Sequence, residues 1–505
     1  MNVPENAGRL TLLEALDIVN ASRAQSGPPF PVLLACGFTP LHLATFLHAY
    51  LQRSLPARRV HVESGLYGDL IGTLERAAAA AAGTAVVVVI EWADLDRRLG
   101  VRHLGGWGTG VRADIIETVQ IAADRVGAAL EAVARDRHVA VCLPTLSLPP
   151  IGHTAGWQAG TFELELQSLI TALATRVSRS NGVRIVRRDR LDRLSPIGDR
   201  FDVRSELRTG FPYQLHHAAA VAELLAAVIE DRVPKKGLIT DLDGTLWSGL
   251  IGEVGVDGIT WDLDAKSQQH GLYQQFLASL ADHGVLIGVA SKNDHDLVDK
   301  ALDRDDLLIE RDRIYPVEVS WGAKSAAVER ILATWNIGAD AVVFVDDSPL
   351  ELAEVRASHP SIHCLQFESD DPRGVWTLLE NLRDLFGKAT VSDEDRIRAA
   401  SLRSGHVAGF GSPATSDDFL STVQARLTLD FRVDATDARA LELVNKTNQF
   451  NINGRRYTHA EWGHLWRFRA PCCFASPTRT SSARSGRSPS WEGEKTVIRC
   501  AWTRG

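Results

Sequence analysis

The stretch LITDLDGTLWSG, at residues 238–249, decides how the middle of this chain folds. An apolar run there ends in Asp241 and Asp243, one residue apart, and Gly244 and Thr245 follow at once. A short continuous apolar run is typical of a buried strand, and residues i and i+2 of an extended segment lie on the same face. The stretch therefore predicts a strand that presents paired carboxylates at the edge of a sheet.

Later segments bring polar groups to similar positions. Ser291, Asp346 and Asp347 stand at the ends of apolar runs, and Lys324 opens the helix after a turn. In open α/β sheets, ligands bind beyond the carboxyl ends of the strands. A D-x-D-x-T motif alone is a modest signal, because turns are rich in aspartate. The four motifs together, in this chain order, predict one site for phosphoryl transfer.

Phosphoryl transfer gives each group a role. We expect Asp241 to be the nucleophile that attacks phosphorus to form an aspartyl phosphate. We expect Asp243 to protonate the leaving oxygen and then to activate water. Ser291 and Lys324 are predicted to bind phosphoryl oxygens and to offset the charge of the transition state. Carboxylates and water are the ligands that Mg²⁺ prefers, and the predicted ligands of this cofactor are Asp241, Asp243, Asp346 and Asp347.

Composition excludes several classes of protein. The chain has 505 residues, 45% of them hydrophobic and 23% charged, which is typical of a soluble globular protein with several domains. A formal net charge of −8 argues against a nucleic-acid partner. The N-terminus has no basic start followed by an apolar segment, and the longest apolar run, 77–90, is too short and interrupted to span a membrane. Six cysteines without a metal-binding pattern indicate a reducing, cytoplasmic compartment.

Apolar runs alternate with amphipathic segments along most of the chain. Expected strands are 31–36, 85–90, 138–144 and 183–188, then 237–241, 285–291, 313–317, 341–347 and 362–367. Expected helices between them include 41–52, 115–134 and 325–336. This alternation predicts an α/β fold with parallel sheets covered on both faces. The predicted division is an N-terminal lead at 1–30, α/β domains at 31–232 and 235–390, a linker with a partial domain at 391–463, and a tail at 464–505.

The motifs of the second domain resemble those of the haloacid dehalogenase superfamily. Longer stretches resemble its FkbH-like subgroup: DLDGTLWSGLIGEVGVDGI at 241–259, ASKND at 290–294, FVDDSPLELAEV at 344–355 and NKTNQFNINGRRYT at 445–458. The resemblance covers roughly residues 30–462 and implies a Rossmann-like catalytic domain. Its motifs are specific, and all four catalytic motifs match.

The resemblance also implies a reaction and a partner. Members of the subgroup take D-1,3-bisphosphoglycerate, remove phosphate and load the glyceryl unit as a thioester on an acyl carrier protein. The unit then enters polyketide extender units or tetronate rings. The alternative is a stand-alone haloacid dehalogenase-type phosphatase that acts on another small phosphate ester, although such an enzyme has no use for the 200-residue N-terminal domain. A non-catalytic docking scaffold is a third reading, which the intact set of aspartates argues against.

The N-terminal domain resembles a degraded SGNH hydrolase. LLACGFTPLH at 33–42 occupies the nucleophile turn without a serine, so that Cys36 is its nearest nucleophile. GFPYQLHHAAAVAELLA at 210–226 resembles the block with the catalytic histidine, which is His217 here. Gln214 replaces the aspartate that orients the histidine, so a working triad is not expected. Cys36 with His217 is a candidate acyl carrier, and the alternative is that Cys36 is a small buried residue.

The C-terminal part begins a further domain that does not continue. A strand at 427–433 and a helix at 435–448 resemble the opening of a GCN5-type (GNAT) acyltransferase fold, as in FkbH-like proteins. Residues 464–505 have neither strand nor helix periodicity, and they lack the Gly-rich loop that such a domain needs for a pantetheine pyrophosphate. The tail is therefore expected to be disordered, or to be the product of a shifted reading frame that truncates the last domain.

Overall fold

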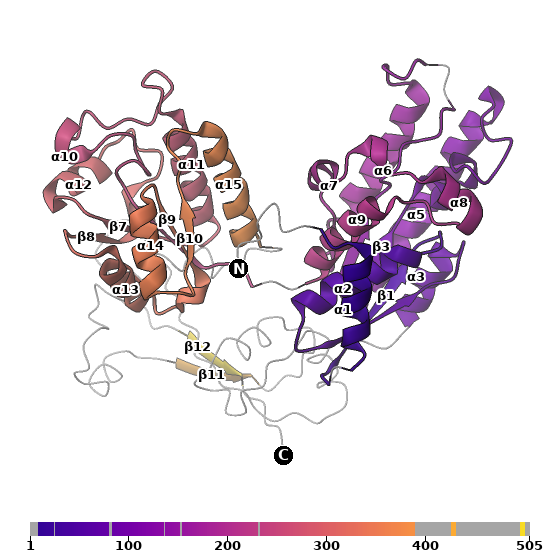
Figure 1. Ribbon diagram of the computed structural model, residues 1–505, viewed down its shortest axis with the longest axis horizontal. Helices are drawn as coiled ribbons and strands as arrows, with labels where there is room; N and C mark the ends of the chain where they lie inside the picture. The colour runs from indigo at the N-terminus through magenta and orange to yellow at the C-terminus, as the bar shows by residue number, and fades with distance from the viewer. Residues whose placement is uncertain are drawn as a thin grey trace. The chain divides into compact units, whose positions relative to one another are not determined.

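The computed structural model describes residues 9–24, 26–79, 83–135, 137–151, 154–230 and 233–388, together with two strands further along the chain. The described part of the chain forms two compact α/β units, and the division between them falls between residues 231 and 232 (Figure 1). The predicted helix at 435–448 lies outside the described residues.

The N-terminal unit is built on a five-stranded parallel sheet in the order β2-β1-β3-β4-β5. Its strands are β1 (Pro29–Ala35), β2 (Arg59–Ser64), β3 (Ala85–Val89), β4 (Val139–Cys142) and β5 (Val183–Ile185). Four of these strands were predicted from continuous apolar runs. The sequence analysis missed β2, an edge strand in which most residues are exposed and polar ones alternate with valines, so that it has no continuous apolar run.

Helices cover both faces of this sheet, as predicted. Val87 and Val89 of β3 pack in one apolar cluster, whereas Val86 and Val88 pack in the other. The first face carries α1 (Leu12–Ser22), α2 (Leu41–Ser54) and α9 (Leu215–Ile229), and the second carries α3 (Leu70–Ala79), α5 (Arg112–Val133) and α6 (Thr161–Val177). Shorter helices in the connections are α4 (Trp92–Leu95), α7 (Arg188–Leu194) and α8 (Val203–Thr209).

The second unit has its own five-stranded parallel sheet, in the order β10-β9-β6-β7-β8. Its strands are β6 (Gly237–Thr240), β7 (Leu286–Ser291), β8 (Ile314–Val319), β9 (Val342–Asp346) and β10 (His363–Gln366), all of which were predicted. The chain runs outward from β6 through β7 to β8 and then returns to the other side of β6 as β9. The strand order therefore reverses between β6 and β9, the position at which open α/β sheets form their ligand site.

This sheet is also enclosed by helices. Leu238 and Ile239, neighbours in β6, pack in different apolar clusters on opposite faces. One face carries α11 (Gln268–Asp282), α12 (His295–Leu302) and α15 (Pro372–Phe386), with the short α10 (Ile251–Val254), and the other carries α13 (Lys324–Trp335) and α14 (Pro349–Ser358). The central strands β6, β7 and β9 are buried along their whole length, whereas the edge strands β8 and β10 are partly exposed. Polar groups that follow the central strands can therefore meet solvent beyond the strand ends.

The two strands beyond residue 388 are β11 (Arg426–Asp430) and β12 (Lys495–Arg499), which pair in parallel. β11 overlaps the strand predicted at 427–433. β12 lies within the tail at 464–505, for which the sequence predicts no regular structure, and it contains the β-branched residues Thr496, Val497 and Ile498. None of the described helices combines the length and apolar character that crossing a membrane requires.

Candidate active site

Three carboxylates meet where the strand order of the second sheet reverses. Asp241 directly follows β6, and its backbone N–H donates to the carbonyl of Val345 in β9 at 2.9 Å. Asp346 is the last residue of β9, and Asp347 follows it. Ligand oxygens of Asp241, Asp346 and Asp347 all lie within 4.8 Å of one another, in a group that could hold a metal ion. The strand pairing therefore sets the separation of these carboxylates.

Lys324 places one positive charge among these carboxylates. It is the first residue of α13, its side chain is 5% exposed, and its Nζ lies 2.9 Å from Asp241 Oδ2 and 2.5 Å from Asp346 Oδ2. One ammonium against three carboxylates leaves an excess of negative charge in a buried place. Such an arrangement favours the binding of a further cation, since an unpaired buried charge is costly.

Burial shapes the titration of these groups. It raises the pKa of Asp241 to about 6, against the opposing attraction of the Lys324 ammonium. It also raises the pKa of Asp346 and of Asp347, and the charge of Asp241 adds to the effect on Asp347. Burial works against the charge of Lys324, but Asp241 and Asp346 outweigh it and raise the lysine pKa. The Lys324 ammonium thus stays charged, but its single positive charge does not balance the three carboxylates.

The surroundings of one Asp241 oxygen indicate whether a metal ion fits at this site. Asp241 Oδ2 contacts Lys324, whereas the buried Oδ1 has no hydrogen-bond partner. A buried polar atom without a partner costs free energy. A hard cation bound by Asp241, Asp346 and Asp347 would supply the missing partner, and the all-oxygen donor set suits Mg²⁺ or a similar ion. The residues present therefore fit the metal that the sequence predicts.

Asp243 lies outside this group of three. Its carboxylate instead accepts hydrogen bonds from the Trp247 indole, the Ile251 backbone and the Asn293 side chain. Its assignment as a metal ligand stays a prediction. Ser291, at the end of β7, is 3% exposed, and its Oγ accepts a hydrogen bond from Asn293 Nδ2 at 3.1 Å.

Trp247 and Asn293 are residues of this site that the sequence analysis did not single out. Asn293 had one available signal, because it stands two residues after the strand-end Ser291 in the same motif. Gly244 supports the turn between these elements: it has φ +70, and a Cβ there would lie 2.4 Å from Asp347 Oδ2. The turn thus brings main chain against a carboxylate where a side chain would not fit without movement.

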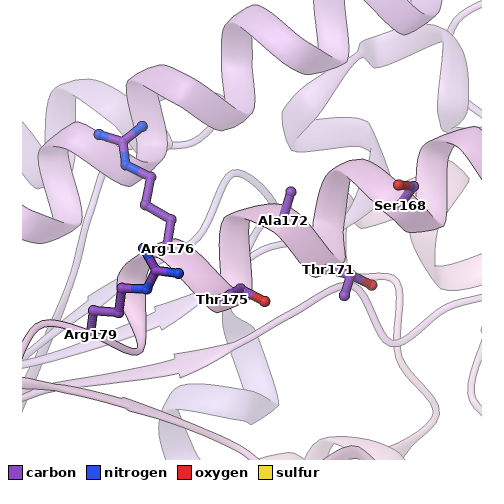
Figure 2. Close-up of a pocket in the computed structure, with 6 residues that line it drawn as sticks. All are labelled: Ser168, Thr171, Ala172, Thr175, Arg176 and Arg179. Carbon is purple, nitrogen blue, oxygen red and sulfur yellow. The ribbon is translucent and has the colours of Figure 1, made fainter.

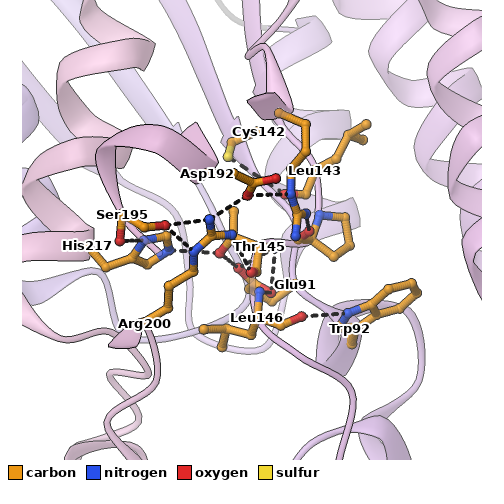
Figure 3. Close-up of polar contacts among 12 residues, drawn as sticks. Glu91, Trp92, Cys142, Leu143, Thr145, Leu146, Asp192, Ser195, Arg200 and His217 are labelled. Atoms are coloured by element: carbon orange, nitrogen blue, oxygen red, sulfur yellow. Dashed lines mark hydrogen bonds and ion pairs between the residues drawn. The ribbon is translucent and has the colours of Figure 1, made fainter. Parts of the chain in front are cut away.

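The N-terminal candidates have different surroundings. Cys36 is 3% exposed, its thiol donates to the carbonyl of Phe38 at 3.3 Å, and burial raises its pKa. His217 is 0% exposed, with Nε2 2.9 Å from Thr145 Oγ1 and Nδ1 2.9 Å from Ser195 Oγ (Figure 3). Hydroxyl groups thus engage both ring nitrogens, and neither is left to activate a thiol. These surroundings favour core roles, and the acyl-carrier role of Cys36 with His217 stays a prediction.

His217 belongs to a buried polar network that the sequence did not reveal. Glu91 accepts hydrogen bonds from the Thr145 hydroxyl at 2.5 Å and the Tyr213 hydroxyl at 2.7 Å. The Arg200 guanidinium donates to the carbonyls of Thr145 and Ser195 (Figure 3). These contacts join the connections after β3, β4 and β5 to α9. We conclude that the network stabilises the carboxyl ends of the strands of the N-terminal sheet.

The turn after β1 is filled by a side chain from another element. A Cβ added at Gly37 would lie 1.8 Å from Oδ1 of Asp94, a residue of α4. Asp94 Oδ2 also accepts a hydrogen bond from the backbone N–H of Glu91 at 2.8 Å. The carboxyl group of Asp94 therefore occupies the space next to Cys36 that a side chain at position 37 would need.

The buried state of His217 predicts an acid-sensitive N-terminal unit. Burial, aided by the charge of Arg200, lowers the pKa of His217 from 6.5 to about 2. Below pH 6.5 the unfolded chain therefore binds a proton at this residue that the folded chain does not bind. The contribution of the neutral, buried His217 to the free energy of unfolding is complete above pH 6.5 and declines as the pH falls below it. We expect the free energy of unfolding to fall by about 1.4 kcal/mol per pH unit from this residue. Urea denaturation at pH 7, 6 and 5 measures the slope.

The neighbouring histidine provides a matched control for this prediction. His216 is exposed, whereas His217 is buried. The slope between pH 6.5 and 5 should become shallower in His217→Asn and stay unchanged in His216→Asn. An equal slope in the two variants would show that His217 is not the group that takes up the proton.

A surface depression on the N-terminal unit is separate from this chemistry. It follows one side of α6 and is lined by Ser168, Thr171, Ala172, Thr175, Arg176 and Arg179 (Figure 2). Arg176 is already paired, because its Nε donates to Glu131 Oε1 at 2.8 Å. The lining contains none of the predicted site residues, and we assign it no role.

Comparison with known proteins supports the fold. No family model and no curated protein sequence matches the chain. Among solved structures, it is similar to the N-terminal part of the protein BF1531 from Bacteroides fragilis, a crystal structure containing a phosphatase domain complexed with Mg. The TM-score is 0.56 at 20% sequence identity, over 74% of this chain and 99% of that chain. The matched share exceeds either compact unit, so both contribute to the likeness.

Proposed function

We propose that this protein is a Mg²⁺-dependent phosphatase of the haloacid dehalogenase type. The observation that carries the proposal is the convergence of Asp241, Asp346, Asp347 and Lys324 at one sheet edge, with Asp241 Oδ1 buried and unpartnered. The magnesium in the similar phosphatase structure is consistent with it. Intact Asp, Ser and Lys motifs in the expected chain order supply the remaining groups.

Each of these residues has a defined role in the two steps of the reaction. Asp241 attacks phosphorus while the bond to the leaving oxygen breaks, and that oxygen takes a proton from Asp243. Asp243 then takes a proton from water as the water oxygen attacks the aspartyl phosphate and frees Asp241. Ser291 and Lys324 hold phosphoryl oxygens through both steps and offset their charge.

The metal would be held by Asp241, Asp346 and Asp347. When bound, Mg²⁺ screens the repulsion between the nucleophilic carboxylate and the phosphoryl group. The protein contributes the position of each carboxylate, which the paired ends of β6 and β9 determine.

The finer proposal names the substrate and the acceptor. We propose that the substrate is D-1,3-bisphosphoglycerate, whose 3-phosphate ester is hydrolysed at Asp241. The C1 acyl phosphate stays intact in that step, and a thiol of an acyl carrier protein then displaces it as phosphate and takes the glyceryl unit as a thioester for polyketide biosynthesis in the cytoplasm. The FkbH-like motifs at 241–259, 290–294 and 344–355 support it, as does a separate N-terminal unit of about 200 residues that simple phosphate hydrolysis does not require. A phosphatase for another small phosphate ester is the alternative.

Intact mass spectrometry separates these two functions. The purified protein is incubated with Mg²⁺, D-1,3-bisphosphoglycerate and candidate carrier proteins, and every protein species is weighed. A glyceryl adduct on a carrier protein supports the transferase. Release of phosphate without any protein adduct supports the simple phosphatase. An adduct on the enzyme that disappears in Cys36→Ala would assign the intermediate acyl group to Cys36, and an adduct that survives would exclude that residue.

Metal dependence gives a second prediction. We expect Asp347→Ala to raise the Mg²⁺ concentration for half-maximal phosphate release at least about tenfold, because a direct ligand is lost. Ser348→Ala is the matched control: its backbone N–H still donates to Asp346 Oδ1, a contact of 2.9 Å, and the hydroxyl only caps α14. Equal shifts in the two metal titrations would remove Asp347 from the metal site.

A further inference from the structure

The Asp243 carboxylate is held by donors from three segments, which are the turn after β6, the start of α10 and the segment after β7. From the turn after β6, the Trp247 indole N–H donates to Asp243 Oδ1 at 2.7 Å. The backbone N–H of Ile251 lies 3.3 Å from Oδ1 and 3.2 Å from Oδ2. From the end of β7, Asn293 Nδ2 donates to Oδ2 at 3.1 Å. Each carboxylate oxygen therefore has a donor, and the side chain cannot rotate without breaking one.

Trp247 is a rigid support for this carboxylate. The residue is 0% exposed and packs with Leu246 and Ile251 in the apolar cluster on the face of the second sheet that carries α11, α12 and α15. An indole has a single donor and no acceptor, so a ring fixed by packing aims its N–H in one direction. The position of Asp243 Oδ1 is therefore coupled to the core.

Asn293 connects Asp243 to the predicted phosphate-binding group. It is 7% exposed, and its Nδ2 lies 3.1 Å from both Asp243 Oδ2 and Ser291 Oγ. One amide thus sets the relative position of a proton donor and a hydroxyl expected to bind a phosphoryl oxygen. Proton transfer requires the two heavy atoms to come within about 2.6–3.2 Å, and misplacement by about 1 Å can cost about 100-fold in rate.

We propose that Trp247, together with Asn293, is a positioning residue that aims Asp243 at the leaving oxygen, an inference that rests on the proposed phosphatase function. The supported step is the one in which the phosphorus–oxygen bond of the ester breaks and the leaving oxygen takes the Asp243 proton. A poor leaving group needs that proton, whereas a stable phenolate leaves without it. The effect of Trp247 should therefore depend on the leaving group.

The test is Trp247→Phe, which keeps a buried ring and removes the N–H. Values of kcat/KM are measured with p-nitrophenyl phosphate, a good leaving group, and phenyl phosphate, a poor one. The parameter kcat/KM reports the steps up to phosphoryl transfer onto Asp241. We expect a fall of less than about twofold with the first ester and about 10- to 100-fold with the second, since general acid catalysis contributes about 10²–10⁴-fold.

Trp335→Phe is the matched control. Trp335 is 2% exposed and its indole N–H also donates a hydrogen bond, to the carbonyl of Tyr315 at 2.8 Å. It packs in the apolar cluster on the opposite face of the same sheet, away from the contacts of Asp243. The control loses the same kind of hydrogen bond, and we expect it to change kcat/KM equally for the two esters.

The outcomes separate the inference from the function on which it rests. An equal fall, or no fall, with both esters in Trp247→Phe would overturn the positioning role, while turnover by the unaltered protein upholds the phosphatase. If the unaltered protein releases phosphate from neither ester nor from D-1,3-bisphosphoglycerate, the phosphatase function and the inference both fail. Should Trp247→Phe not fold, Asn293→Ala takes its place with the same expected ratio. Independently of activity, the indole N–H resonance of Trp247 should move in Asp243→Asn, and an unmoved resonance would refute the contact.

Discussion

Asp241→Asn is expected to abolish measurable phosphate release, with a fall in kcat of at least about 10⁴-fold, because the amide cannot act as the nucleophile. The fold should persist, since Asp346, whose Oδ2 lies 2.5 Å from Lys324 Nζ in the unaltered protein, remains to pair with that ammonium. Phosphate release with Mg²⁺ and circular dichroism measure the two properties. Asp312→Asn, an exposed aspartate of the same unit, is the control and should retain full activity.

A trapping experiment strengthens this test. Acid quenching during turnover should leave the mass of one phosphoryl group on the peptide that contains Asp241, and none in Asp241→Asn. Near-normal turnover in the variant, or a phosphoryl group on another residue, would contradict the assignment of Asp241 as nucleophile.

Lys324→Met should reduce both activity and stability. The substitution leaves the carboxylates of Asp241 and Asp346 buried without their shared cation, and breaking such a buried pair costs about 3–5 kcal/mol of the free energy of unfolding. Phosphate release should fall at least about 100-fold, because one charge that stabilises the transition state is lost. Urea denaturation and phosphate release are the measurements.

Lys300→Met is the control for this second prediction. Lys300 lies in the last turn of α12 in the same unit and is exposed, so that its loss removes no buried contact. We expect both measured properties to stay unchanged there. If Lys324→Met were as stable as the unaltered protein, the buried ion pairs would not have the stabilising role given to them here.

The sequence predicted the strands wherever a continuous apolar run marks a buried strand, as in β3 and β9. It missed β2, because an edge strand exposes alternate side chains and loses that signal. It also missed α1 in the predicted lead at 1–30, although Thr11 and Glu14 form a capping box at the helix start. An amphipathic helix of 11 residues near a chain end is a short signal, and packing on α2 stabilises it.

Along the chain, the sequence by itself determined which polar groups stand at the carboxyl ends of β6, β7 and β9, because strand ends follow from local apolar patterns. That was sufficient to bring Asp241, Asp346 and Asp347 into one predicted site. Hydrogen bonds between distant turns have no such local pattern. The contact of Asp243 with Asn293 therefore emerged only when the turn after β6 was folded against the segment after β7. The contact with Trp247 spans only four residues, but the direction of the indole N–H depends on the packing of the buried ring.

The surroundings of Cys36 and His217 were decided by the tertiary structure. Cys36 and His217 stand in sequence positions that suit a nucleophile and its base, yet folding encloses the thiol and engages both imidazole nitrogens with Thr145 and Ser195. The reactivity of a thiol or an imidazole depends on its solvation and partners. Those are properties of the packed chain, because elements far apart in the sequence supply them, whereas the order of strands and strand-end carboxylates is written locally in the residues themselves.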